Sequence, residues 1–473
     1  MKKIVRWGIA GALIPVLAWG NWTEVTKFVE GAGDGNLSAG YSIDADNDYL
    51  VVGAPDENGS YGPHDGAVYV YKKSSSGEWV PQDRIAGYYN ESLGTDVAVR
   101  DMGSEGVYIA AGAPDYEFYN AKTGTTTYRD TVKVYSQNVA GNFVTMWVFY
   151  DANGSGLGSS VDLASFTEIS GIPPNITTQD KGILVVAGVP FSSTADGKVS
   201  TYAFSLTDGN SSNWKSFTIS DPGLVYNHYG HAVAVTDDLK FSIAVNGRAH
   251  LAVGAPDEDV QNSGGTETYT DKGAVYVYEL DGTFSGGFSW TKEARLTQDV
   301  DGVLRSGSEY ADASRFGTSV DLTQRHLVAG ALIENVVSTL TTIHVGEADL
   351  FSLYDISANG WDHNTTFIQP ENPDPAASER FGYAVSIDTQ NMITVGAPDF
   401  GGTGAVFVYG YDTNSSDWLA AGTIVGQSAG ALGSSVDTLD GKVIAGDPDS
   451  DSVSVFEWKE PNVNPALLMY LLN

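Results

Sequence analysis

The hydrophobic positions of this chain fall into short runs of roughly four to eight residues, each bounded by turn residues. The runs form a unit that recurs along the chain: an aromatic or small residue and glycine, an apolar run, a turn, a run ending in V-G-A-P-D, and a run reading G-A-V-Y-V-Y. Clear V-G-A-P-D copies begin at Val52, Val253 and Val395, and weaker ones begin at Ala111, Ala187, Ala329 and Ala445. Seven copies of one unit predict a repeat architecture.

Each unit is typical of a four-stranded antiparallel blade. In the sixth copy the expected strands are residues 383–387, 392–395, 405–409 and 418–425. Pro398 ends the second run, as expected for a residue that has no N–H to donate to a neighbouring strand. The fold class predicted is all-β, a seven-bladed β-propeller.

The last repeat predicts how the ring closes. It contains only three apolar runs, the third ending at residues 456–458, whereas a fourth run stands alone at residues 21–29. We expect this N-terminal strand to complete blade seven, because closure removes the open sheet edges at which chains aggregate.

The two ends of the chain predict a secreted, periplasmic or cell-surface protein. Lys2, Lys3 and Arg6 precede an apolar stretch at residues 7–19, and Ala18-x-Gly20 is a small-residue cleavage site, so residues 1–20 are expected to be a signal peptide. An uncleaved anchor is the alternative, but the stretch is short for a membrane span. Residues 21–460 form the expected propeller and residues 461–473 a short apolar tail.

Composition narrows the classes of partner. The chain has 473 residues, a net charge of −34 and no cysteine. Binding to nucleic acid depends on basic side chains, so this charge argues against such a partner. Without cysteine the chain can form no disulfide and carry out no thiolate chemistry.

The repeated residues resemble the FG-GAP repeats of integrin α subunits and of many bacterial surface proteins. Phe316-Gly317, Phe381-Gly382 and the intact Gly-Ala-Pro triplets carry the resemblance, which extends over about residues 21–460. It implies an extracellular propeller that binds another macromolecule, a protein or a glycan, and catalyses no reaction.

No cofactor is firmly implied, and calcium is the one candidate. Repeats of this family often hold Ca²⁺ in an Asp-rich loop between the first two strands, and the complete loop occurs in none of these repeats. Asp44, Asp46 and Asp48 come closest, but Ca²⁺ prefers six to eight oxygen ligands. A solvated Asx-rich turn explains these three residues better than a calcium site does.

A second set of acidic residues follows the Gly-x-Pro exits. Ring symmetry should place these residues at one radius on one face, hereafter the Gly-Ala-Pro face. They are Asp56, Asp115, Asp257, Asp399 and Asp449, joined by Asp447. Each could cap its own turn, or together they could attract a cation or a basic partner.

The loops between the second and third strands leave from that same face, and several are long, including an apolar excursion at residues 334–344. On the opposite face, the turns between the first and second strands are expected to be long at residues 166–181 and 237–248. Long loops on a rigid scaffold are frequent binding sites, and exposed tyrosines are common on recognition surfaces. The candidate ligand-binding residues there are Tyr61, His64, Asp65, Tyr116, Tyr119, Tyr128, Glu258, Asp259 and Tyr269.

Two other function classes stay open. A propeller lyase or hydrolase would gather Asp, His, Arg and Tyr in one deep central pocket, and a surface-layer component would need no discrete ligand. The sequence contains no nucleophile elbow, phosphate-binding loop or zinc-protease motif. A binding module is therefore the main hypothesis, and we expect no enzyme activity.

Overall fold

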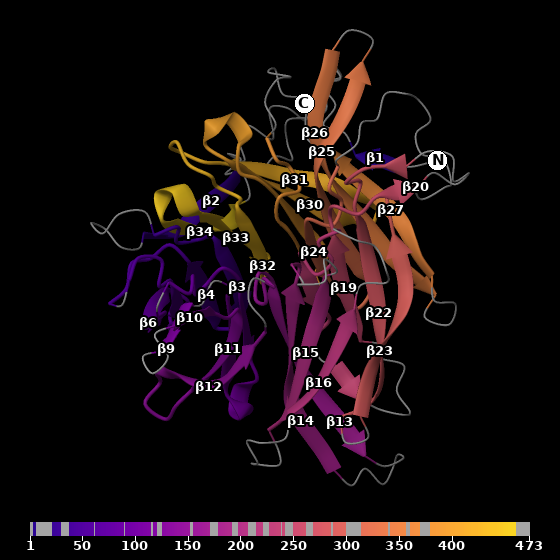
Figure 1. Cartoon of the computed structure of the whole chain (residues 1–473). Coiled ribbons are helices and arrows are strands. Elements are labelled where there is room, and N and C mark those ends of the chain that lie inside the picture. The colour runs from indigo at the N-terminus through magenta and orange to yellow at the C-terminus, as the bar shows by residue number, and fades with distance from the viewer. Residues whose placement is uncertain are drawn as a thin grey trace.

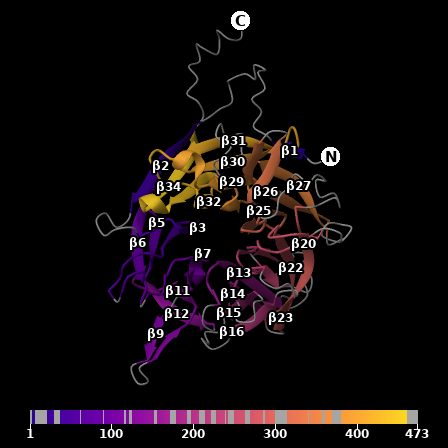
Figure 2. The ribbon, with the colours of Figure 1, turned by 45° about the horizontal axis from the view of Figure 1, so that its top comes forward.

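The computed structural model is a ring of β-sheets around a central axis (Figures 1 and 2). It describes residues 3–5, 21–29, 37–60, 62–88, 90–114, 117–120, 125–151, 155–170, 178–191, 197–206, 214–220, 227–237, 239–241, 249–261, 268–284, 287–298, 314–338, 341–355, 360–368 and 379–459. Seven sheets form the ring, so the predicted seven-bladed propeller is confirmed.

Each blade runs from an inner first strand to an outer fourth strand, with antiparallel neighbours. Blade one is β3 (Ser42–Asp46), β4 (Tyr49–Ala54), β5 (Ala67–Lys73) and β6 (Trp79–Ala86). Blade two is β7 (Val97–Asp101), β8 (Val107–Ala113), β11 (Thr131–Gln137) and β12 (Phe143–Tyr150), and blade three is β13 (Val161–Ser170), β14 (Thr178–Val189), β15 (Lys198–Ser205) and β16 (Trp214–Ser220).

The other four blades follow the same order. Blade four is β17 (Val233–Val235), β19 (His250–Ala255), β22 (Ala274–Thr283) and β23 (Gly287–Leu296), and blade five is β24 (Ser319–Leu322), β25 (His326–Ser338), β26 (Thr341–Asp355) and β27 (Gly360–Ile368). Blade six is β28 (Val385–Ile387), β29 (Met392–Ala397), β30 (Ala405–Asp412) and β31 (Asp417–Val425). Blade seven contains β32 (Ser435–Leu439), β33 (Lys442–Asp447) and β34 (Ser452–Lys459).

The predicted closing strand is confirmed. β2 (Asn21–Val29) pairs antiparallel with β34 as the outermost strand of blade seven, and the two ends of the ring lie side by side in Figure 2. The rings of Trp22 and Trp458 meet edge to face across this pair, with their centroids 5.7 Å apart. Phe28 reaches blade one, where its ring lies 4.2 Å from that of Tyr71.

The two glycines of the repeat are explained by one contact between neighbouring blades. In blade six, the N–H of Gly382 donates to the carbonyl of Gly396, which joins the first two strands. A Cβ on Gly396 would overlap the carbonyl oxygen of Gly433, the first-strand glycine of blade seven. The equivalent overlap is found at all seven blade junctions, so the triplet glycine lets adjacent inner strands approach closely.

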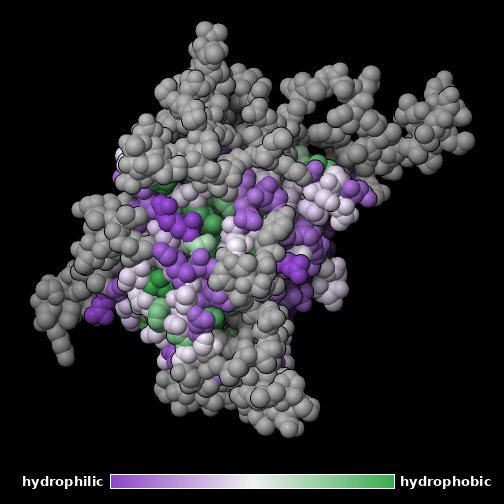
Figure 3. Space-filling model, turned by 90° about the vertical axis from the view of Figure 1, so that its right-hand side faces the viewer, coloured by the Kyte–Doolittle hydropathy of each residue, from purple (hydrophilic) through white to green (hydrophobic). Residues whose placement is uncertain are grey.

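The core consists of apolar layers between adjacent blades. One layer joins blades three and four and includes Phe166, Leu251 and Tyr276, each almost fully buried. Strand residues therefore contribute to packing on both sheet faces, which accounts for their continuous apolar runs. On the side of the molecule shown in Figure 3, hydrophobic residues lie in small groups among hydrophilic ones.

Three regions expected to be long turns or loops contain strands. In blade three, residues 166–181 are not one turn, because β13 continues to Ser170 and β14 begins at Thr178. Within the turn expected at residues 237–248, β18 (Leu239–Phe241) pairs in parallel with β13. The excursion at residues 334–344 belongs to the β25–β26 hairpin, which projects from the ring (Figure 1).

Shorter strands complete the described chain. Two ribbons lie between second and third strands: β9 (Glu117–Asn120) with β10 (Thr125–Tyr128), and β20 (Val260–Gln261) with β21 (Thr268–Tyr269). Within the predicted signal peptide, β1 (Lys3–Val5) pairs in parallel with β27. The apolar tail at 461–473 lies outside the described residues.

Candidate functional site

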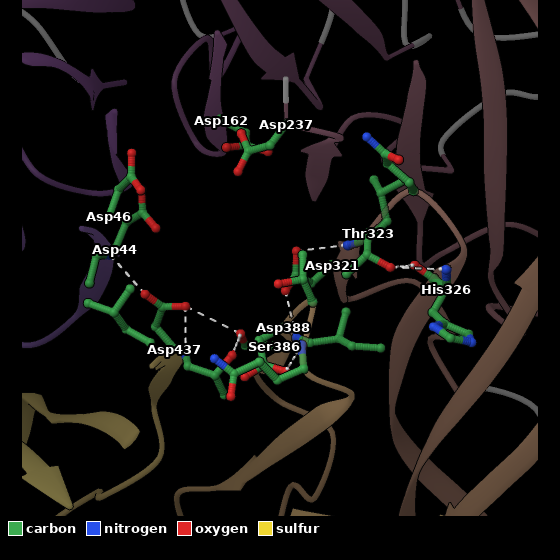
Figure 4. Close-up of a pocket in the computed structure, with 18 of the residues that line it drawn as sticks. Asp44, Asp46, Asp162, Asp237, Asp321, Thr323, His326, Ser386, Asp388 and Asp437 are labelled. Carbon is green, nitrogen blue, oxygen red and sulfur yellow. Dashed lines mark hydrogen bonds between the residues drawn. The ribbon is translucent and has the colours of Figure 1, made fainter. Parts of the chain in front are cut away.

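The most distinctive chemistry lies in the central channel, which is lined by the first strands. A cavity of about 640 Å³ opens toward the turns between strands one and two, and one of about 470 Å³ opens toward the Gly-Ala-Pro face. The two cavities share four carboxylates at the waist of the channel, from Asp44, Asp162, Asp321 and Asp437 (Figure 4). The waist is therefore acidic from several sides.

These carboxylates bridge one blade to the next. The residues at the waist belong to a Ser-x-Asp motif that starts two residues after the first-strand glycine in blades one, three, five and seven. In blade one, the Ser42 hydroxyl donates to the Gly94 carbonyl over 2.9 Å, and Asp44 accepts the N–H of Val99 over 2.6 Å. The inner strands of adjacent blades cannot form a continuous sheet. The Ser and Asp side chains instead satisfy backbone groups on the next inner strand that have no partner strand on that side.

The same bridge recurs around the ring. In blade five, Ser319 donates to Gly382 and Asp321 accepts from Ile387. In blade seven, Ser435 donates to Gly40 and Asp437 accepts from Ala45, which crosses the closure point of the chain. Asp162 accepts from Val235 over 2.7 Å, and Asp96 in blade two accepts from Val161 over 2.7 Å.

One buried cation joins four blades at the lower mouth, the end of the channel opposite the Gly-Ala-Pro face. Arg100 of blade two donates to the carbonyl of Leu163 in blade three and to Asp237 of blade four, and lies 3.4 Å from Asp46 of blade one. Burial opposes its charge, but the surrounding carboxylates, led by Asp237, raise its pKa above the ordinary value. Arg100 therefore offsets part of the negative charge on this side.

The waist carboxyls titrate far from their usual range. Burial raises the pKa of Asp44, Asp96 and Asp321 to about 7 and that of Asp162 to about 6. Burial also holds the pKa of Asp437 well above its ordinary value, and the nearby Asp44 carboxylate adds to the effect. Desolvation and like-charge repulsion both favour the neutral form.

We expect the propeller to be more stable at pH 5.5 than at pH 8. The unfolded carboxyls release their protons near 3.8, whereas the folded ones hold them to about pH 6 or 7. Their stabilising contribution is complete below the lower value and is lost as the pH rises through the higher one, at about 1.4 kcal/mol per pKa unit.

The variant Asp321→Asn isolates this effect, because its amide oxygen can still accept the N–H of Ile387. Thermal melting monitored by circular dichroism should show a smaller difference between pH 5.5 and pH 8 for Asp321→Asn than for the unsubstituted chain. An equal difference in the two proteins would show that Asp321 does not contribute.

The Asp residues after the Gly-x-Pro exits have local partners. Asp56 accepts the Ser38 hydroxyl over 2.6 Å, Asp399 binds Arg380 through both oxygens, and Asp257 contacts His228 and Arg315. Although burial opposes it, His228 and Arg315 lower the pKa of Asp257 to about 2.

These partners share one place in the repeat. They stand two residues before a first-strand glycine, and Ser38, His228, Arg315 and Arg380 all have positive φ. In blade seven, Asp447 accepts the N–H of Ala431, at the same place in the repeat, over 2.7 Å. Asp56, Asp257 and Asp399 therefore each bind a turn residue with positive φ, which accounts for their recurrence. Asp449 lies in the short 3-10 helix Pro448–Ser450. Asp115 lies outside the described residues.

None of the acidic sets forms a cation cage in the part of the chain that the structure describes. No group of three or more His, Asp or Glu residues there could hold a metal ion. Asp44 and Asp46 lie in β3 rather than in a hairpin loop, and accept the N–H groups of Val99 and Asp101. Asp48 lies in the turn that follows.

The upper mouth, where the channel opens on the Gly-Ala-Pro face, carries aromatic side chains. The residue after the first-strand glycine lines it in every blade, and in four blades it is Thr95, Ser159, Thr318 or Ser434. Each of these four hydroxyls donates to the carbonyl three residues earlier and stabilises its turn.

The other three blades replace that hydroxyl with an aromatic ring, from Tyr41, His231 and Tyr383. Phe191 adds a half-exposed ring at the same mouth. Desolvation inside the mouth, with the neighbouring His228, lowers the pKa of His231 to about 4, so its imidazole is neutral at pH 7. Desolvation by the surrounding wall of the mouth, with Tyr383 and Asp96 nearby, raises the pKa of Tyr41 to about 12, although 44% of the residue is exposed.

The loop residues expected to bind ligand divide into several groups. His64 is exposed, with Nδ1 3.0 Å from Asp56, and Asp259 is exposed but accepts the N–H of Asp271. Tyr119, Tyr128 and Tyr269 lie in the strands of the two ribbons, β9, β10 and β21. Tyr61 and Tyr116 lie outside the described residues.

Two of the predicted ligand-binding residues are buried, which corrects their expected place on the surface. Asp65 accepts the N–H groups of Gly62 and Asn90 and closes its own loop. Glu258 accepts the Tyr276 hydroxyl over 2.9 Å and pairs with Arg295. In both loops a buried carboxylate accepts hydrogen bonds from neighbouring groups. The sequence does not show whether an acidic loop residue is buried in this way or exposed.

The fold and the channel define the class of this protein: a seven-bladed β-propeller with a carboxylate-bridged hub. Residues 22–71 match the FG-GAP repeat family, which confirms the resemblance seen in the repeats. No curated protein matches the chain. Among solved structures it is similar to Saccharomyces cerevisiae Sqt1, at 10% sequence identity over 90% of this chain and 83% of that chain, with a TM-score of 0.43.

Within the described residues, no helix is long and apolar enough to cross a membrane.

Proposed function

We propose that this protein is a secreted or cell-surface binding module whose ligand, a protein or a glycan, docks on the Gly-Ala-Pro face over the upper mouth of the channel. The observation that carries the proposal is the replacement of the turn-stabilising hydroxyl by Tyr41, His231 and Tyr383. Four blades keep the hydroxyl, so the turn does not require an aromatic ring.

The surroundings of these rings suit recognition. Tyr41 and Phe191 are 44% and 50% exposed, while the turns that carry them are fixed by the ring of blades. Rigid aromatic side chains lose little conformational entropy on binding and are frequent hot spots. The long loops of the same face, including the exposed His64, extend the surface beyond the mouth.

We propose binding without catalysis. The channel does gather Asp, Arg and His, as an enzyme would require, but Asp44, Asp162, Asp321 and Asp437 each accept a backbone N–H from the next blade. The position of each carboxylate is explained by its hydrogen bond to the next blade, which stabilises the ring.

The test compares the mature chain with the double variant Tyr41→Ala/Tyr383→Ala on a glycan array and on immobilised extracellular-matrix proteins. We expect at least one ligand whose affinity falls tenfold or more, about 1.4 kcal/mol, in the double variant. Tyr150→Ala is the matched control, because Tyr150 is 53% exposed on an outer strand.

Equal binding by the double variant would place the site elsewhere and refute the proposal. The arrays are run both with calcium and with a chelator, and loss of signal in chelator would show that the ligand requires the metal. Amino-terminal sequencing of the secreted chain should begin at Asn21.

A further inference from the structure

A separate pocket lies between blades five and six, on the face opposite the aromatic mouth. It has a volume of about 300 Å³ and is lined by Arg325, His326, Asn364, Asn391, Tyr411 and Trp418, among others. Arg325, His326 and Asn391 also line the lower cavity of the channel, so the two spaces adjoin. His326 is among the residues shown at this cavity in Figure 4.

The equivalent corner of blade one shows how a protein side chain can fill this space. Lys73 pairs with Trp79 across β5 and β6, just as Tyr411 pairs with Trp418 across β30 and β31. The Lys73 ammonium lies 5.0 Å from the Trp79 ring centroid and donates to the carbonyl of Asn47 and to Asp440 of the preceding blade. A lysine thus fills that corner.

In blade six the corner is open. Tyr411 is 40% exposed, and its ring stands edge-on to Trp418 with the centroids 5.5 Å apart. Its backbone N–H donates to the carbonyl of Asn391, so the strand and turn have the same relation as in blade one. The difference lies in the side chain, which leaves space where Lys73 has its ammonium group.

Trp418 forms part of the pocket wall. Its side chain is only 3% exposed, and its indole N–H is buried without a hydrogen-bond partner among the described residues. The indole N–H groups of Trp22 and Trp214 are buried in the same way, whereas Trp290 donates to Thr201 and Trp361 donates to Glu293. Trp418 therefore supplies apolar surface against which a ligand can pack.

The remaining groups suit a sugar. Tyr411 offers an exposed aromatic face for the C–H groups of a pyranose ring. The Asn364 amide donates to Ser352 and keeps its carbonyl oxygen as an acceptor, and Arg325 is an exposed donor. Burial lowers the pKa of His326, so its imidazole can both donate and accept without adding charge.

We propose that this pocket binds a neutral pyranose unit of an oligosaccharide, stacked on Tyr411 and hydrogen-bonded by Arg325 and Asn364. A neutral sugar fits better than an anionic one because Asp321, Asp388 and Asp440 line the adjoining cavity. That cavity also presents Thr323, Gln324 and Gln390, whose hydroxyl and amide groups can contact a second sugar unit. This site is distinct from the upper mouth and goes beyond the function proposed above.

The experiment is saturation-transfer NMR of the chain, produced in a host without N-glycosylation, with the methyl glycosides of glucose, galactose, mannose, N-acetylglucosamine and glucuronic acid. We expect at least one neutral glycoside to bind. Tyr411→Lys copies the residue of blade one and should reduce its affinity at least tenfold while the protein stays folded. Val144→Lys, which adds the same charge at a 45% exposed position, should bind like the unsubstituted chain.

Arg325→Ala, in an exposed turn, gives a second reading if Tyr411→Lys misfolds, and should also lose affinity. The Tyr41→Ala/Tyr383→Ala variant should keep full glycoside binding, so this proposal and the one above fail separately. The pocket proposal is overturned if no neutral glycoside binds, if glucuronate binds more tightly than the neutral sugars, or if Tyr411→Lys or a folded Arg325→Ala variant binds as well as the unsubstituted chain.

Discussion

Removal of residues 21–29 from the mature chain is expected to destabilise the propeller more than any single substitution. β2 is the outer strand of blade seven and pairs with β34 from Asn21 to Val29. Its loss removes those hydrogen bonds together with the Trp22–Trp458 and Phe28–Tyr71 contacts. Burial of each large apolar side chain is worth up to about 3 kcal/mol, before the cost of the exposed edge is counted.

The exposed edge gives the experiment a second reading. Without β2, the backbone N–H and C=O groups of β34 face solvent and can pair with another chain. Calorimetry should show a large fall in melting temperature, and size-exclusion chromatography should show aggregation. A chain that lacks only residues 1–20 is the control and should melt as a monomer, and a synthetic peptide of residues 21–29 should restore part of the lost stability. A truncated chain with an unchanged melting temperature would show that the ring does not depend on β2.

The fold could be read from the sequence because each of its determinants is local and is repeated. The Gly-Ala-Pro triplet ends a strand wherever it occurs. Because the unit recurs seven times, an irregular copy can be interpreted from the regular ones. Closure by residues 21–29 could be predicted by counting strands. The last repeat has only three strands, and the strand at residues 21–29 precedes the first repeat. The long hairpin in blade three was not predicted because polar residues interrupt the apolar pattern at 166–170 and occupy all of 178–181.

The channel could not be predicted in the same way. The bond between Asp437 and Ala45 joins residues 392 positions apart, and it exists only because the ring closes. A usable signal was nevertheless present, in the Ser-x-Asp motif two residues after the first-strand glycine of four blades. In the sequence, Asp44 resembles part of a calcium-binding loop. In the structure, its carboxylate lies at the waist of the channel.

The upper mouth shows a different limit. Tyr41, His231 and Tyr383 are ordinary residues within their own segments, and they stand out only when the seven equivalent positions are compared. The lower pocket likewise depends on the comparison of Tyr411 with Lys73. In a repeat protein, departures from the repeat are therefore more informative about function than the repeat itself.

Replacement of a triplet glycine by alanine is expected to be the most damaging single substitution. In Gly396→Ala, the new methyl group would overlap the carbonyl oxygen of Gly433, a backbone atom of blade seven. A side chain could rotate away from such a contact, but a backbone carbonyl can move only if the blade moves. We expect a loss of about 3 kcal/mol or more, at or beyond the upper end of the range for overpacking.

The same blade offers a matched control. Gly410 lies in β30, and a Cβ there meets no atom within 4 Å, so Gly410→Ala should leave stability unchanged or raise it by about 0.4–1 kcal/mol. Denaturant titration of both variants separates the blade contact from the general effect of replacing a strand glycine. If Gly396→Ala is no less stable than Gly410→Ala, then inner strands can spread apart at little cost, and the glycine contact does not hold the blades at their spacing.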